Sequence, residues 1–396
     1  MAERNDKMSD EETLKHYKPG EGFPAPSGSE AELELPAGVK ELLDKARASN
    51  PEFVKAEIAI DPIMTNRKSA VLQPEKNEED KKMVNMSDDK KMVYLSDEET
   101  LKHVIAFDAP PEGFDPNVAD DRLLLRHGIP RRPDAHREPL LRRLWDSAFA
   151  SKPRFIKAEI AIDPIMSKRR RPVLDKRVET LNFSPSGWAG DVVLVSTKNY
   201  NPPEPVNTVY GEWFIPNVTP IPNEPAGNQT VGFWVGIDGF TNGQVLQAGS
   251  AATVNGNNVT NWVWTEWFPL GAIQVTNFPI KPGDYLTVLV CAPQPNHGFC
   301  SMLNKTTNQA TSIGITPPGG VTNIGASAEW IVEGISSVLP VFSTVVFQNC
   351  SAGTKDNAFN AEGGIIAEIT GSGGANLTSA AILSDNKVVV KWLKAS

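Results

Sequence analysis

The sequence predicts an all-β protein, an antiparallel β-sandwich, over its carboxyl-terminal half. From Trp188 onward, short apolar runs alternate with clusters of Gly, Pro and Asn. The runs occupy residues 191–196, 209–215, 231–237, 261–268, 285–291, 328–332, 343–347 and 387–393. Strand-length runs at this spacing, with no helical periodicity between them, are typical of a sandwich or a barrel.

A change in composition marks a domain boundary near Val178. No arginine follows Arg177 and only seven lysines lie beyond it, whereas the preceding residues hold most of the basic charge. We therefore expect the β-sandwich domain at 179–396, with an amino-terminal extension before it. The net charge of −9 argues against a nucleic-acid binder. We interpret the basic stretch 168–177 as a solvated linker rather than a nucleic-acid patch.

The extension contains a duplication. Residues Met8 to His16 return, with one change, as Leu95 to His103, and Lys55 to Met64 return unchanged as Lys157 to Met166. Two copies are too few for a solenoid, which needs about three stacked units. The extension is either a pro-segment or docking arm, or an inert linker that duplicated, and the sequence leaves both open.

The two copies divide the extension at residues 1–94 and 95–178. Each has one candidate helix, Val39 to Ala48 in the first and Glu138 to Ala150 in the second. In the second helix an apolar face is predicted from Leu140, Leu141, Leu144 and Trp145. The first copy is expected to be largely disordered, since its end at 77–91 is mostly charged and polar. The extension as a whole is therefore expected to be partly disordered and partly helical.

Polar groups stand among large apolar residues in several of the predicted strands. Burying an amide or a carboxylate is costly unless the group is hydrogen-bonded or used in chemistry. Alternation along a strand places alternate residues on one face. The groups that this alternation selects are Trp234 with Asp238, Gln247, Trp264 with Glu266, and Glu329 with Glu333. A carboxylate that takes a proton, beside an amide that donates to an oxyanion, would suffice for amide hydrolysis.

These positions also have ordinary structural interpretations. Gln247 could be a strand residue bonded to neighbouring backbone, and Asp238 or Glu266 could be acids bonded within turns. Trp234 and Trp264 could be plain core residues of the sandwich. Parity alone does not establish that these side chains converge.

The same segments resemble the glutamic peptidases, or eqolisins, over roughly residues 180–396. The motifs that carry the resemblance are Trp234-Val-Gly-Ile-Asp-Gly239, Leu246-Gln-Ala-Gly249, Thr265-Glu-Trp-Phe-Pro269 and Ala328-Glu-Trp-Ile-Val-Glu333. Gly187-Trp-Ala-Gly190 is similar to the start of the family's mature domain. The resemblance implies two packed antiparallel sheets with the jelly-roll topology of concanavalin-like lectins. It also implies an acid-acting endopeptidase without a cofactor.

By this resemblance, Gln247 and Glu333 are the catalytic glutamine and glutamate. Glu333 would activate water and Gln247 would stabilise the oxyanion, while Trp234, Asp238, Trp264, Glu266 and Glu329 would line or support the cleft. Glu329 shares a strand face with Glu333, so the assignment could shift along that face. Trp262 stands where the family often has Asp, which affects subsite polarity. Two other functions remain open, a lectin-like carbohydrate-binding module and a two-carboxylate glycosidase.

Other chemistries find little support in the sequence. The five histidines show no metal-ligand spacing, so we predict no metal site. No apolar stretch approaches the length of a membrane span, and residues 1–6 show no secretion-leader core, so the compartment is not predicted. Cys291 and Cys300 flank a short loop and could pair across a hairpin, which would leave Cys350 unpaired. The expected partner is a peptide or protein substrate, and we expect a monomer.

Overall fold

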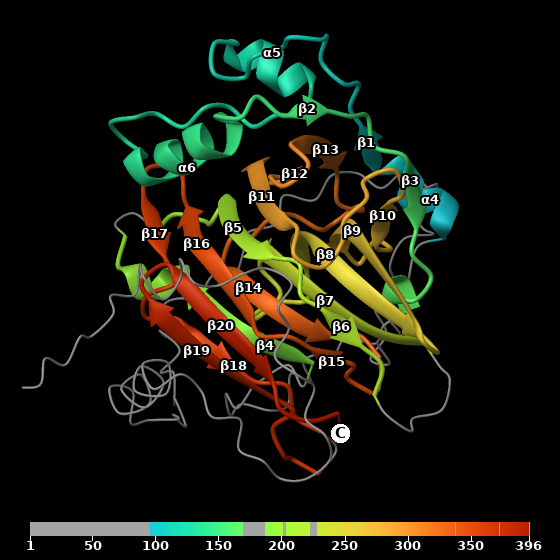
Figure 1. The fold of residues 1–396 in the computed structure, drawn as a ribbon. Coiled ribbons are helices and arrows are strands. Elements are labelled where there is room, and N and C mark those ends of the chain that lie inside the picture. Colours follow the sequence, from blue (N-terminus) through green and yellow to red (C-terminus); the bar gives the residue numbers. More distant parts are fainter. Residues whose placement is uncertain are drawn as a thin grey trace, which may run out of the picture.

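Two large β-sheets packed face to face form the body of the protein in the computed structural model (Figure 1). The structure describes residues 96–168, 187–200, 203–221, 228–336, 338–371 and 373–395. The sheets are antiparallel apart from one short parallel pair. The predicted β-sandwich is therefore confirmed. The helix predicted at Val39 to Ala48 and the domain boundary near Val178 lie outside the described residues.

The first sheet has ten strands. Its path is β1 (Val104–Ala106), β13 (Gln309–Ile315), β12 (His297–Asn304), β11 (Tyr285–Gln294), β5 (Thr208–Phe214), β16 (Val345–Gly353), β20 (Lys387–Trp392) and β19 (Thr378–Ser384). Beside this path, β17 (Ala358–Asn360) pairs with β16, and β2 (Arg154–Phe155) pairs with β13. Two very short strands, β6 (Val218–Thr219) and β15 (Val341–Phe342), form a separate pair.

The second sheet has eight strands and carries the candidate site. Its order is β18 (Ile365–Ala367), β4 (Trp188–Leu194), β14 (Ser327–Gly334), β7 (Asn228–Ile237), β8 (Val245–Asn255), β9 (Asn258–Phe268), β10 (Ile273–Val275) and β3 (Ile160–Ile162). The meander of β7, β8 and β9 pairs without a bulge from Asn228 to Ile237 and from Val245 to Phe268. This uninterrupted register keeps side chains of one parity on one face over the whole meander.

The main core lies between the two sheets and uses one parity of each strand. On β7 it takes Phe233, Val235 and Ile237, whereas Trp234 belongs to a second cluster on the outer face. Both clusters are buried, which explains why several strands are nearly continuous apolar runs rather than clean alternations. The eight predicted runs all fall on observed strands. Strands β8, β12, β13 and β19 were not among the predicted runs.

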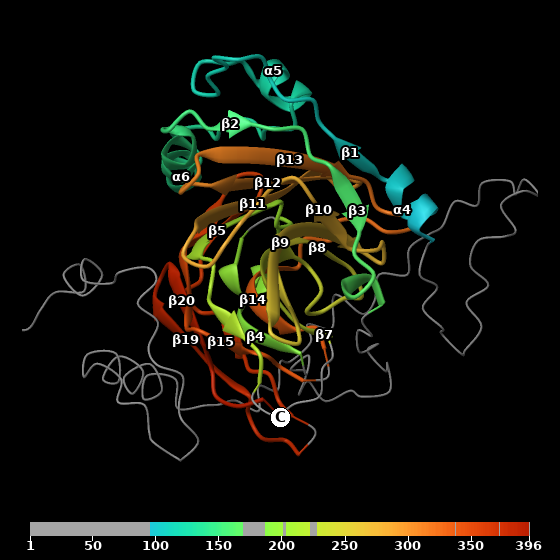
Figure 2. The same cartoon turned by 45° about the vertical axis from the view of Figure 1, so that its right-hand side comes forward.

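The second copy of the extension completes both sheets at one end of the sandwich (Figure 2). It begins with helix α4 (Asp97–Lys102), and β1 and β2 then add to the edge strand β13 of the ten-stranded sheet. Helices α5 (Asp121–Arg126) and α6 (Pro139–Phe149) lie between those two strands in the chain. Strand β3 and the short helix η2 (Met166–Lys168) then reach the edge of the eight-stranded sheet. The second copy is thus more than a partly helical linker.

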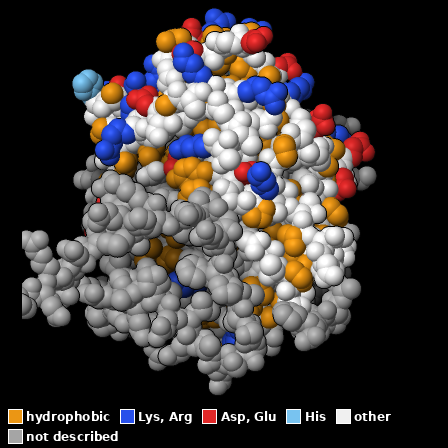
Figure 3. Space-filling model, viewed as in Figure 1, with side chains coloured by type: hydrophobic (Ala, Val, Ile, Leu, Met, Phe, Trp, Pro, Cys, Tyr) orange, Lys and Arg blue, Asp and Glu red, His pale blue; other side chains and the backbone are white. Residues whose placement is uncertain are grey.

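Helix α6 seals a third apolar cluster against the outer face of β12 and β13. Trp145 and Phe149 of α6 pack there with Leu303 and Ala310. The predicted helix is confirmed to within a residue at each end, but its buried face is shifted. Leu140 is only half-buried, and the face continues instead through Ala148 and Phe149. Charged side chains gather over this extension, at the top of the view in Figure 3, as the uneven composition predicted.

The possible disulfide between Cys291 and Cys300 is not formed, because all three cysteines are free thiols. In the β11–β12 hairpin, Cys300 pairs with Val290, and Cys291 pairs with Phe299. The two thiols therefore point to opposite faces of the sheet. Cys300 lies in the main core, and Cys291 faces outward beneath the extension.

Candidate active site

The candidate site lies on the outer face of the eight-stranded sheet, turned away from the ten-stranded one. The apolar cluster there includes Trp188, Trp234, Trp262, Trp264, Phe268 and Ile331. Gln247, Glu266, Glu329 and Glu333 have the strand parity of this cluster and are all buried. One amide and three carboxyl groups thus share a face with several tryptophans, as the alternation of residues predicted.

Three of these polar residues stand in one row across four strands. Glu329 of β14 is opposite Gly236 of β7, Gly236 is opposite Gln247 of β8, and Gln247 is opposite Glu266 of β9. Neighbouring strands are about 4.8 Å apart. Because Gly236 has no side chain, the row leaves room for the Trp234 ring between Glu329 and Gln247. Glu333 lies four residues further along β14, opposite Gly232.

Gln247 is fully buried and is held by its amide nitrogen. Its Nε2 donates to Oε2 of Glu266 at 2.5 Å. The described residues provide no hydrogen-bond partner for its Oε1. The structural interpretation, in which the side chain bonds to neighbouring backbone, is therefore not what the structure shows. An unpartnered buried carbonyl oxygen is rare and calls for an explanation.

The indole of Trp234 lies between Glu333 and Gln247. Its Nε1 donates to Oε2 of Glu333 at 3.0 Å. A Cβ at Gly232 would lie 3.6 Å from Cδ1 of this ring, and a Cβ at Gly236 would lie 2.9 Å from its Cζ3. The ring therefore runs along β7 above both glycines. A Cβ at Gly236 would also lie 3.2 Å from the Cβ of Gln247.

The remaining tryptophans fix this arrangement from the sides. Trp188 packs edge-on against Trp234, with ring centroids 4.9 Å apart, and it is opposite Glu333 in the β4–β14 ladder. The Nε1 of Trp264 donates to the carbonyl oxygen of Ser250 at 3.1 Å. Aromatic rings locked by packing and hydrogen bonds hold their neighbours more rigidly than loops would. Trp264 is thus a buried wall residue with its own polar anchor.

Asp238 is placed differently from the expectation that it faces the site. It follows the end of β7 with a positive φ of 70°, which turns it out of the strand alternation. Its carboxylate accepts from the backbone N–H groups of Ile324, Gly325 and Ala326 at 2.7–2.9 Å, and from the side chain of Asn242. Burial raises the pKa of Asp238, and these donors oppose that rise. Asp238 thus anchors the loop that leads into β14.

Sequence reasoning missed three contributors to the site. Gly232 and Gly236 form the floor on which the Trp234 ring lies, and their spacing around Trp234 was the available signal. Trp188 was noted in a motif but was not assigned a place beside Glu333. Met166, from the extension, is fully buried in the same outer-face cluster as Trp234 and Trp264. Nothing in its local sequence indicated that contact.

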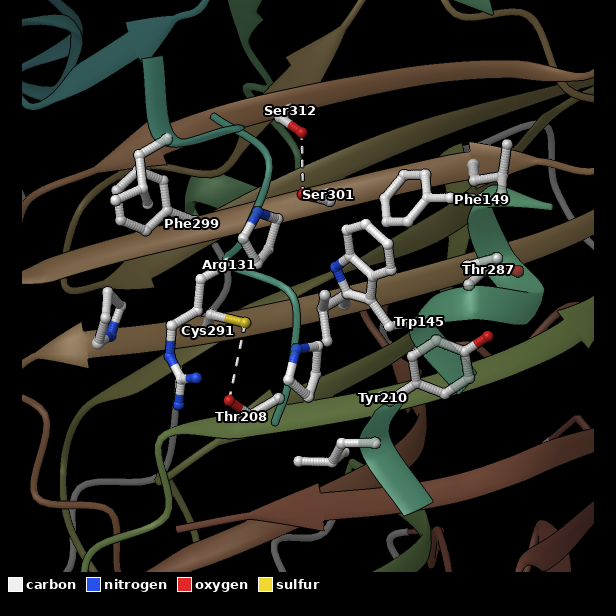
Figure 4. A pocket seen from close by; sticks show the side chains of 18 of the residues that line it. Arg131, Trp145, Phe149, Thr208, Tyr210, Thr287, Cys291, Phe299, Ser301 and Ser312 are labelled. Carbon is white, nitrogen blue, oxygen red and sulfur yellow. Dashed lines mark hydrogen bonds between the residues drawn. The ribbon is translucent and has the colours of Figure 1, made fainter. Parts of the chain in front are cut away.

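A cavity of about 420 Å³ lies elsewhere, between helix α6 and the outer face of the ten-stranded sheet (Figure 4). Trp145, Tyr210 and Cys291 are among the side chains that line it. Burial raises the pKa of the Cys291 thiol to about 12, so it is not a thiolate nucleophile at ordinary pH. Across the described residues, no cluster of three or more His, Cys, Asp or Glu side chains could hold a metal ion. The same residues contain no helix long and apolar enough to cross a bilayer.

The fold is a β-sandwich, and one of its outer faces brings buried carboxyl and amide groups together. Comparison with known proteins agrees, since the model of the peptidase A4 family matches residues 186–392. The chain belongs to this family, the glutamic peptidases, and it is a glutamic endopeptidase acting on peptide bonds.

Individual relatives are more distant. Aspergillopepsin-2 of Aspergillus niger is 26% identical over 246 residues, which are 55% of this chain and 83% of that protein. Among solved structures, scytalido-glutamic peptidase with a transition-state analogue inhibitor is 21% identical. That match covers 52% of this chain and 98% of the other, with a TM-score of 0.45. Aspergilloglutamic peptidase from Aspergillus niger is 26% identical and covers 41% and 99%, with a TM-score of 0.39.

Proposed function

We propose that the chain hydrolyses peptide bonds in acid by a pair formed from Gln247 and Glu333. The observation that carries the proposal is the state of Gln247. It is fully buried, its Nε2 is fixed by Glu266, and its Oε1 has no partner among the described residues. A buried polar atom in that condition costs about 1–3 kcal/mol. Binding a water or a substrate group at Oε1 would offset that cost.

In this mechanism Glu333 acts as the general base. Its Oε2 is held by the Trp234 indole, so the carboxylate has a fixed orientation. It takes a proton from the attacking water as the oxygen bonds to the scissile carbonyl carbon, and it returns that proton to the leaving amine. The reaction consumes one water and one peptide bond and needs no redox partner.

Gln247 would act on the other side of the same carbonyl. A carboxamide has two N–H donors and two acceptor sites. One N–H is used by Glu266, which leaves the second to donate to the oxyanion, while Oε1 orients the water. Glu266 is a positioning residue in this scheme, because it fixes the rotation of the amide. Glu329, buried on β14 opposite Gly236, would support this arrangement.

Acidic conditions should favour this site. Glu266, Glu329 and Glu333 share one buried face, and charges of one sign in a low dielectric repel one another strongly. Acid relieves such repulsion in a cluster of carboxylates. We therefore expect activity to rise as the pH falls below neutral.

The test is digestion of denatured casein from pH 2 to 7 by the full chain and two variants. We expect Gln247→Ala to lower kcat about 10²–10³-fold and Glu333→Gln to lower it about 10²–10⁴-fold. Gln244→Ala is the matched control, because Gln244 lies three residues before Gln247 and bonds to the Thr322 carbonyl instead. The activity of Gln244→Ala should stay within about threefold of the parent, a much smaller change than the loss of one oxyanion donor causes.

Two results would overturn the proposal. One is a folded Gln247→Ala or Glu333→Gln protein that cleaves casein like the parent. The other is a folded parent that shows no cleavage at any pH. Retained binding to glycans in the second case would favour the carbohydrate-binding alternative, and hydrolysis of a glycan would favour the glycosidase.

A further inference from the structure

The two duplicated motifs of the extension meet on one loop. Thr100 belongs to the first motif, and its Oγ1 accepts from the Gly271 N–H at 3.4 Å. Ser167 directly follows the second motif, and its Oγ accepts from the Ala272 N–H at 2.9 Å. Figures 1 and 2 both place α4 and β3 side by side next to β10. Motifs that are far apart in the sequence therefore dock at the segment between β9 and β10.

The second motif also extends the eight-stranded sheet. Residues 160–162 pair with β10 in antiparallel register, so that Ala161 is opposite Gln274. The Asp163 N–H donates to the Ala272 carbonyl at 2.8 Å, and the Asp163 carboxylate caps the turn that begins helix η2. That turn directs Met166 into the outer-face cluster, where it is fully buried. We call the edge of β10 together with residues 270–272 the β10 groove.

The first copy contains the same sequence as the segment that pairs with this groove. Its residues Lys55 to Met64 are identical to Lys157 to Met166, and the offset of 102 residues continues on both sides. Position 65, the counterpart of Ser167, is a threonine, which keeps a hydroxyl oxygen to accept from Ala272. The first motif likewise keeps its threonine, as Thr13 in place of Thr100.

Contacts to the other sheet are not duplicated in the same way. Trp145 and Phe149, which seal the cluster over β12 and β13, correspond to Leu43 and Arg47. Ala106 of β1 corresponds to Pro19, which has no N–H to donate to a ladder. The longest stretch repeated without change, Lys157–Met166, therefore contains the strand that pairs with the edge of the β10 groove.

We propose that the β10 groove binds either copy, and that Lys55–Met64 of the same polypeptide exchanges there with Lys157–Met166. Strand addition to a sheet edge takes its affinity from main-chain bonds and its specificity from alternate side chains, and both are the same for identical segments. Because both copies belong to one chain, each has an effective concentration of roughly millimolar for the groove. Occupancy by the first copy lengthens the chain between the groove and β4 from 21 to 123 residues.

Engineered disulfides in the full chain test this exchange. Ala161→Cys with Gln274→Cys joins the directly opposed pair and is the positive control. Ala59→Cys with Gln274→Cys reports docking of the first copy, because Ala59 is the counterpart of Ala161. Ala70→Cys with Gln274→Cys is the control for random collision, since Ala70 lies outside the repeated decapeptide. The three native cysteines are buried and should stay reduced under mild oxidation.

The proposal predicts an intrachain disulfide for the Ala59 pair at least tenfold faster than for the Ala70 pair. Adding Met64→Asp should reduce the Ala59 rate to that of the Ala70 pair, because the charge cannot enter the apolar cluster. Adding Met166→Asp should instead raise the Ala59 yield. Equal rates for the Ala59 and Ala70 pairs, or crosslinks formed only between chains, would overturn the proposal.

Discussion

Two buried polar residues, Glu212 on the ten-stranded sheet and Gln247 on the eight-stranded sheet, differ in how fully they are hydrogen-bonded. On the ten-stranded sheet, Glu212 accepts from five side chains of the same face, namely Tyr210, Tyr285, Thr287, Lys305 and Asn349. On the outer face of the eight-stranded sheet, Gln247 Oε1 has no hydrogen-bond partner among the described residues, whereas Asp191 of β4 is buried on the opposite face, toward the main core. A saturated buried network fixes a structure, whereas an unsatisfied one costs stability and is retained where it serves chemistry. We therefore expect Glu212 to stabilise the fold and Gln247 to take part in the proposed chemistry.

The same contrast gives two opposite dependences on pH. Burial alone would raise the pKa of Glu212, but Lys305 and the tyrosine hydroxyls outweigh it and lower that pKa. Its contribution to stability is therefore present above the unfolded pKa and is lost as the pH falls through the folded pKa. Burial raises the pKa of Asp191 well above its usual range. Its native state then holds an extra proton, so stability falls as the pH rises above about 4.

The largest effect is expected from removing the cation of the Glu212 network. Lys305→Met leaves a buried carboxylate without its ion-pair partner, which costs about 3–5 kcal/mol. Denaturant unfolding at pH 7 measures the loss. Lys355→Met is the control, because Lys355 is exposed and should change stability by less than about 0.5 kcal/mol. A loss below 1 kcal/mol for Lys305→Met would mean that the network is not the anchor of that sheet.

A smaller effect is expected from Gly236→Ala on the reactive sheet. The new methyl group would lie 2.9 Å from Trp234 Cζ3 and 3.2 Å from the Gln247 Cβ, so the indole between the two catalytic groups must move. A misplacement of about 1 Å at such a site can cost about 10²-fold, and we expect at least a tenfold loss in kcat.

Gly243→Ala is the control for this substitution. No atom lies within 4 Å of a Cβ at Gly243, in the loop between β7 and β8. Casein digestion by both variants provides the comparison. Equal activities would show that the place of the Trp234 ring is not critical.

The last effect, expected from Asp191→Asn, is a change in the pH dependence of stability. The substitution removes the titrating group, so the variant should lose less stability than the parent on going from pH 4 to pH 7. Unfolding by denaturant at both pH values measures the difference. Asp356→Asn, at an exposed position, should leave the pH dependence of the parent unchanged. If stability falls equally between pH 4 and pH 7 in the parent and in Asp191→Asn, Asp191 is not the cause of that pH dependence.

Much of the sandwich was predictable because its strands are apolar runs bounded by Gly, Pro and Asn. Strand β8 was less visible, since Ala, Gly and Ser fill the positions that close packing against Trp234 requires to be small. Parity predicted which residues share a face within each strand, but only the strand register shows that Gln247, Glu266 and Glu333 lie on the same face of the sheet. Contacts set by tertiary structure did not follow, because no local pattern encodes them.

Asp238 and the cysteines illustrate that limit. A positive φ takes Asp238 out of the alternation on which its predicted place relied, and three backbone donors from a distant loop then capture it. Cys291 and Cys300 are close in sequence, but the hairpin register puts them on opposite faces. Loop length alone could not supply that register.

The central claim is that the eight-stranded sheet performs chemistry and that the Glu212 network of the ten-stranded sheet provides stability. The most direct test compares Glu333→Gln with Glu212→Gln in casein digestion at acidic pH and in denaturant unfolding at pH 7. The account predicts that Glu333→Gln unfolds like the parent but cleaves at least about 10²-fold more slowly. Glu212→Gln should cleave like the parent while it remains folded, but should unfold at lower denaturant. The reverse pattern, with activity lost in Glu212→Gln and retained in Glu333→Gln, would contradict the account.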